Sequence, residues 1–164
     1  MSVPQGPDVR ARPAWPAPPP SFLSQPRAYS ALRHEFDAIV AEIKPRLQRC
    51  RSERPDGMFE LTVLPHRVIV RVDDDAVSFS WVSGRIPTVA GGCLLVIAWT
   101  HVASNARGAA ALRSATPADE RTYIAEGASA GDWRWCADDR VGLAQSSAHL
   151  TADWLGRTSI APSA

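Results

Sequence analysis

The sequence contains few cysteines and no hydrophobic run long enough to cross a membrane. Its three cysteines, Cys50, Cys93 and Cys136, are far apart and odd in number, so they indicate neither a disulfide framework nor a Cys-x-x-Cys metal site. The longest apolar stretch, residues 89–99, is far shorter than the roughly 20 residues of a transmembrane helix. Prolines interrupt the N-terminal region, which therefore does not match a signal peptide. We expect a cytoplasmic protein that does not enter a membrane.

Strong charge of either sign is also missing. The formal net charge is +1, too small to direct the chain to nucleic acid or to an anionic membrane. Basic residues do gather near the end of the first predicted helix, where cations complement the negative end of the helix dipole. They are Lys44, Arg46, Arg49, Arg51 and Arg54. Since no aromatic residues are interleaved with them, the cluster does not favour nucleic-acid binding.

Proline is concentrated at the N-terminus, with eight of the 14 prolines in the first 26 residues. Such a segment favours extended polyproline II conformation and offers little apolar surface to bury. The rest of the chain is long enough, and apolar enough, for one hydrophobic core. We expect a disordered arm over residues 1–27, a single domain over residues 28–160 and a short tail over residues 161–164.

Apolar residues at helical spacing predict a long helix after the arm. They recur every three or four residues and place one stripe on one face: Tyr29, Leu32, Phe36, Ile39, Ile43 and Leu47. We expect this helix to begin near Ser24 or Pro26, with Ser24 as its cap. Pro45 lies inside the pattern and predicts a kink or an early stop.

Alternating residues predict strands over 59–63, 68–72 and 77–81, joined by tight turns. The next segment, Cys93–Trp99, is apolar at every position, which is typical of a strand covered on both faces. Residues 103–121 show no periodicity and are expected to form a mobile loop. Two short strands, over 122–126 and 133–136, then predict a hairpin. A final helix is expected from Ser146 or Ser147 to Gly156.

This order predicts an α+β fold. We expect an antiparallel sheet of about six strands, a β-meander plus a hairpin, with an N-terminal and a C-terminal helix on one face. Two helices cover only one face, so the second face of Cys93–Trp99 needs another cover. The 103–121 loop, the N-terminal arm or a second subunit could provide it, and we favour a homodimer or a partner protein because the loop has few large apolar residues.

One motif points to catalysis. Residues 127–131 match the G-x-S-x-G pattern of serine hydrolases around Ser129, and Asp138, Asp139 and His149 follow in the hydrolase order. That chemistry requires the serine on a turn from a strand into a helix, whereas Asp132–Trp135 continues with a strand pattern. A hairpin loop of small residues explains the motif better, so we expect no enzyme.

Metal and cofactor motifs are missing. The four histidines, His34, His66, His101 and His149, are not spaced three or four residues apart. A run of aspartates between strands, such as residues 73–75, is typical of a solvated turn. We therefore expect no metal site and no cofactor.

Tryptophans on the predicted strands are the remaining candidates for function. Indoles of this size dominate cores but also line pockets and interfaces, often with arginine at the rim. The candidate binding residues are Trp81, Arg85, Trp99, Trp133, Arg134 and Trp135. The leading hypothesis is a non-enzymatic protein-interaction or dimerisation module. The alternatives are a small-molecule binder with a Trp-lined pocket and, third, a small hydrolase that uses Ser129.

Overall fold

The computed structural model describes residues 21–139 and 142–158 and contains one six-stranded antiparallel sheet. Each strand pairs with the next along the chain, so spatial order equals sequence order. The strands are β1 (Phe59–Leu64), β2 (Arg67–Val72), β3 (Asp75–Val82), β4 (Cys93–Thr100), β5 (Thr116–Glu126) and β6 (Arg134–Ala137). The predicted α+β meander is confirmed.

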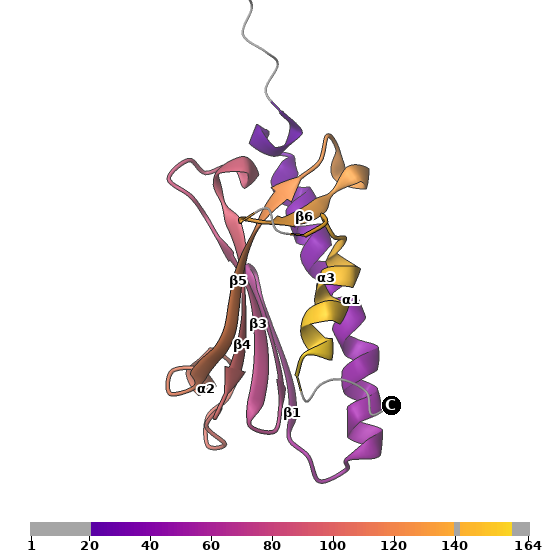
Figure 1. Ribbon diagram of the computed structural model, residues 1–164, viewed down its shortest axis with the longest axis vertical. Helices are drawn as coiled ribbons and strands as arrows, with labels where there is room; N and C mark the ends of the chain where they lie inside the picture. Colours follow the sequence, from indigo (N-terminus) through magenta and orange to yellow (C-terminus); the bar gives the residue numbers. More distant parts are fainter. Residues whose placement is uncertain (1–20, 140–141, 159–164) are drawn as a thin grey trace, which may run out of the picture.

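Two helices, α1 (Ala28–Glu53) and α3 (Ser147–Gly156), pack against each other on one face of the sheet (Figure 1). The short helix α2 (Gly108–Ala111) lies on the opposite side of the sheet (Figure 1). Three 3₁₀ turns complete the order: η1 (Phe22–Ser24), η2 (Val89–Gly91) and η3 (Ala130–Asp132). No helix in the described residues is long and apolar enough to span a membrane.

Helix α1 differs from the sequence prediction at its start and at Pro45. It begins at Ala28, and Ser24 lies in η1, where its hydroxyl is bonded to that of Ser21 instead of capping α1. Proline inside a helix costs about 3 kcal/mol, yet the helix continues to Glu53. Pro45 is exposed while Leu47 and Cys50 beyond it are buried, so packing of the later turns outweighs that cost. The predicted early stop is therefore wrong.

Helix α3 confirms its predicted cap. The Ser146 hydroxyl accepts from the His149 backbone N–H at 3.3 Å, and the helix ends at Gly156. The predicted loop over residues 103–121, in contrast, is wrong. It contains α2, and β5 begins at Thr116, six residues before the predicted strand. Pairing with β4, and not apolar alternation, makes residues 116–121 a strand.

Residues 21–27, which the prediction places in the arm, belong to the fold, because Leu23 is buried in the main core. The arm over residues 1–20 and the tail over residues 161–164 lie outside the described residues.

The main core fills the layer between the sheet and the two long helices. Alternate residues of β2, β3 and β4 point into it and are fully or almost fully buried: Val68, Val70, Val72, Val77, Phe79, Trp81, Leu94, Val96 and Ala98. The predicted apolar stripe of α1 and the side chains Leu150, Trp154 and Leu155 of α3 close the layer. We call this side of the sheet the inner face.

The outer face is covered in part by the segment 102–115. Val102, Ala111 and Leu112 from this segment pack on Ile69 and Ala76 of the sheet. Ile97 is 8% exposed, whereas Cys93 and Leu95, farther along β4, are half-buried. The chain itself therefore covers part of the second face of Cys93–Trp99. A second subunit over the remaining part stays a prediction.

A buried arginine holds this cover in place. Arg71 of β2 is 1% exposed, and four of its guanidinium hydrogen bonds reach backbone carbonyls. Nε donates to Asp73 at 2.8 Å, Nη1 donates to Ala103 and Ala106 at 2.9 and 3.0 Å, and Nη2 donates to Val102 at 3.2 Å. A buried charge needs such partners to offset its lost hydration. The guanidinium thus ties the start of segment 102–115 to the sheet.

We expect Arg71→Met to destabilise the protein by about 2–4 kcal/mol, because several carbonyls lose their charged donor. The matched control is Arg67→Met, on the same strand and face, where the guanidinium bonds to the Ser80 hydroxyl at 2.8 Å; its cost should be about 1 kcal/mol or less. Urea denaturation measures both losses, and hydrogen exchange of residues 102–112 should speed up in Arg71→Met alone. Equal losses in the two variants would contradict this role.

Candidate functional site

Three of the candidate tryptophans form a cluster in the main core. Trp81, Trp133 and Trp135 are 7%, 2% and 0% exposed. The ring of Trp135 lies 6.3 Å from that of Trp81 and 5.4 Å from that of Trp133, centroid to centroid. These tilted and edge-on contacts are typical of aromatic packing in cores. The geometry supports a structural role for this cluster.

A chain of polar contacts links the cluster to both long helices. The Trp135 Nε1–H donates to the Ser147 hydroxyl of α3 at 2.8 Å, and that hydroxyl donates to the Glu35 carboxylate of α1. The indole N–H groups of Trp81 and Trp133 are buried and have no hydrogen-bond partner in the described residues. The sequence could not indicate the Glu35–Ser147 contact, which joins residues 112 positions apart.

The other three candidates are not part of the buried cluster, although Arg134 donates from Nη1 to the Trp133 backbone carbonyl at 2.7 Å. Trp99 is half-buried and donates from Nε1 to the Ser78 hydroxyl at 2.9 Å. Arg85 is exposed in the loop between β3 and β4, and Arg134 is exposed on β6, two strands beyond β4. The structure therefore brings together the three core indoles, places Arg134 on the exposed side of β6 next to them, and leaves Trp99 and Arg85 outside the cluster.

Ser129 does not lie on a strand-to-helix elbow. It follows β5 in the hairpin loop and precedes the three-residue turn η3, which leads into β6. The ring of His149 lies at the start of α3, with Nδ1 3.2 Å from the Ser146 hydroxyl. Ser129 instead lines an open apolar groove together with His34 of α1. The hairpin-loop interpretation of the motif matches this placement.

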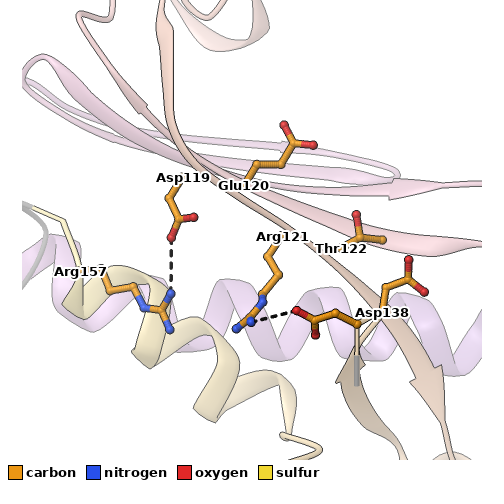
Figure 2. A pocket seen from close by; sticks show the side chains of 7 residues that line it. Asp119, Glu120, Arg121, Thr122, Asp138 and Arg157 are labelled. Carbon is orange, nitrogen blue, oxygen red and sulfur yellow. Dashed lines mark hydrogen bonds and ion pairs between the residues drawn. The ribbon is translucent and has the colours of Figure 1, made fainter. Parts of the chain in front are cut away.

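A charged pocket of about 520 Å³ opens between β5 and the C-terminal end of α3 (Figure 2). Figure 2 shows two ion pairs in its lining: Arg157 with Asp119 at 3.5 Å, and Arg121 with Asp139 at 3.3 Å. Arg157 also pairs with Asp153 at 2.6 Å. The carboxylate of Asp139 raises the pKa of the Arg121 guanidinium.

Charged side chains dominate the lining of this pocket. Its lining consists of acidic residues, two arginines and Thr122, and the paired side chains are about one-third to one-half exposed. Exposed ion pairs of this kind contribute about 0–1 kcal/mol to stability. In the part of the chain that the structure describes, no three His, Cys, Asp or Glu side chains are placed to hold a metal ion. The pocket is a solvated ion-pair cluster.

The sheet also has open edges, which can pair with another chain. At β6, Trp135 exchanges both backbone hydrogen bonds with Gln145, at 2.7 and 2.8 Å. Residues 116–122 of β5 do not pair with β6, and this part of the strand carries Pro117, Asp119 and Glu120. Proline and charged side chains are the usual protection of an edge. These two edges are therefore blocked or protected.

The remaining edge, β1, is covered at its start by Arg51 of α1, and the Gly108 N–H of α2 donates to its Glu60 side chain at 2.9 Å, whereas the part at Leu61 and Val63 lacks such protection. Its sequence, FELTVL, contains one charged residue and no proline. The Asp73 N–H donates to the Met58 carbonyl at 2.8 Å, and hydrogen-bonded pairs alternate along an antiparallel ladder. The N–H and C=O groups of Phe59, Leu61 and Val63 therefore point away from β2. Arg51 donates to the Phe59 carbonyl at 3.1 Å, which confirms that this carbonyl points away from β2.

A groove runs beside the end of β1. Two adjoining cavities of about 280 and 220 Å³ lie between α1 and the β1–β2 turn and share the lining residues Arg33, Phe36 and Pro65. We call them together the α1–β1 groove. Val63, which also lines it, is 55% exposed. A strand added to β1 would direct alternate side chains toward this groove.

The β1 edge is absent from the sequence-based candidates. A signal for it exists in the sequence, because the first strand of a meander is an edge strand by topology and residues 59–64 carry a single charge.

No family model, no curated protein and no solved structure matches this chain.

We expect the Cys93 thiol to react slowly with iodoacetamide at mildly alkaline pH. Burial raises its pKa, and the carboxylate of Asp138 raises it further, so less reactive thiolate is present at a given pH. Asp138→Asn should lower this pKa and speed the alkylation of Cys93. Mass spectrometry measures the alkylation rate between pH 7 and 10. The control is Asp139→Asn, which removes the partner of Arg121 and should leave the rate at Cys93 unchanged. Equal acceleration by both variants would contradict the assignment.

Proposed function

We propose that this protein is a non-enzymatic protein-interaction module that binds an extended segment by strand addition to β1. The single observation that carries the proposal is the open part of the β1 edge at Leu61 and Val63, next to the α1–β1 groove, in a sheet whose other edges are blocked or protected. In strand addition, main-chain hydrogen bonds supply affinity, and pockets for alternate side chains supply specificity.

The chemistry of the edge defines what it would bind. Leu61 and Val63 each present one free donor and one acceptor, so the incoming backbone needs an N–H at alternate positions and cannot be proline there. Phe36, Val63 and Pro65 favour an apolar side chain in the groove, with Arg33 and Asp37 at its margin. The bound segment is thus an extended stretch of alternating apolar residues.

In this proposal the buried tryptophans have a structural role and do not contact the partner. They lie in the core that fixes α1 and α3 over the sheet, and α1 forms one wall of the groove. Their packing thus helps to hold α1, one wall of the groove, against the sheet.

The proposal is tested with a random peptide library displayed on phage and selected against the full chain. Selected peptides should be rich in alternating apolar and β-branched residues. Binding should weaken at least tenfold in Val63→Pro, because proline removes the outward N–H while the bonds of β1 to β2 remain intact.

The matched control is Val63→Thr, which keeps the N–H and the β-branched shape and should bind within about threefold of wild type. Circular dichroism and urea denaturation establish that both variants are folded. No enriched peptides, or enriched peptides that bind Val63→Pro as tightly as wild type, would overturn the proposal.

A further inference from the structure

We infer that the segment added to β1 is β1 of a second copy of this chain, paired antiparallel about a two-fold axis at Leu61. This inference rests on the proposed function and names its partner. A two-fold interface uses the same surface on both copies, so the strand must complement itself in its backbone groups, its side chains and its charges.

The backbone groups restrict the register. Outward groups belong to Phe59, Leu61 and Val63, so only odd-numbered residues can form hydrogen-bonded pairs across the axis. With the axis at Leu61, Leu61 pairs with Leu61 of the second copy and Phe59 pairs with Val63. Leu61 and Val63 then find partners, and the Phe59 carbonyl, which already accepts from Arg51 at 3.1 Å, accepts from Val63 of the second copy with its second lone pair. With the axis moved to Thr62, Phe59 would face Pro65, which has no N–H to donate.

The exposed apolar side chains agree with this register. Six large hydrophobic residues are exposed in the described part of the chain, and three of them lie in or next to β1. They are Met58 (38%), Val63 (55%), Leu64 (43%), Val82 (45%), Ile86 (65%) and Leu143 (91%). In the two-fold pairing Leu64 faces Met58 of the second copy, and Val63 faces Phe59. Cross-strand pairs of apolar residues stabilise a sheet by about 0.2–1 kcal/mol each.

The charges also agree. Glu60 is the one acidic residue of β1 and faces Thr62 of the second copy, so no like charges oppose each other. The pairing also leaves no β1 edge for a third copy, because each copy uses its β1 edge once. The outer edges of the joined sheet are then the two β6 strands, where Gln145 occupies the backbone groups of Trp135. The geometry therefore points to a dimer and not to a filament.

The test is the solution mass of the full chain by light scattering across a concentration series. Wild type should pass from monomer to dimer, Val63→Pro should raise the dissociation constant at least tenfold, and Val63→Thr should leave it within about threefold. A monomer at every concentration, or a dimer that Val63→Pro leaves unchanged, would overturn the inference.

A matched pair of variants tests the register. Thr62→Lys places a lysine opposite Glu60 of the second copy and should tighten the dimer, whereas Thr62→Glu places like charges there and should weaken it. The two dissociation constants should differ at least fivefold at low salt and converge as salt is added. Urea denaturation at low concentration corrects for any effect on the monomer. Weakening by both variants would contradict the axis at Leu61.

The two proposals fail in different ways. Selected peptides that require the Val63 N–H, together with a wild-type chain that stays monomeric, would leave strand addition standing and exclude the second copy. Failure of both experiments would exclude the β1 edge as an interaction site.

Discussion

The buried guanidinium of Arg71 is the interaction on which the arrangement of the sheet depends. A sheet with helices on one face leaves its other face in water unless the chain returns to cover it. Here segment 102–115 covers part of that face, and the hydrogen bonds of Arg71 to Val102, Ala103 and Ala106 hold it there. The segment leaves the other end of the outer face accessible, where Leu64 and Val82 are exposed and Cys93 and Leu95 are half-buried.

The edges of the sheet follow from its topology. A meander in which every strand pairs with its neighbour leaves its first and last strands as edges. The last edge is closed by Gln145, and the protruding part of β5 is protected by Pro117 and by its charged residues. The first edge has backbone groups directed outward, a single charged residue and a groove against α1. Its chemistry is that of a strand that accepts another strand.

Sequence patterns predict the parts of this fold that depend on local periodicity. The stripe of α1, the alternation of β1 to β3 and the Ser146 cap are local features, and the structure confirms them. Residues 116–121 carry no apolar pattern. They form a strand because they pair with β4, and a sequence pattern does not indicate that pairing. Three of the four carbonyls that accept from Arg71 lie more than 30 positions away, and no spacing indicates such a contact. The tryptophans are recognisable as large apolar residues, whereas their burial in one cluster depends on packing between distant elements.

Residue-resolved hydrogen exchange at low and high protein concentration tests the central claim that β1 is an open, self-pairing edge. The amides of Glu60 and Thr62 bond to β2 and should be protected at both concentrations. The amides of Leu61 and Val63 should exchange rapidly in dilute solution and become protected as the concentration rises. Exchange at Leu61 and Val63 that is independent of concentration would contradict the account.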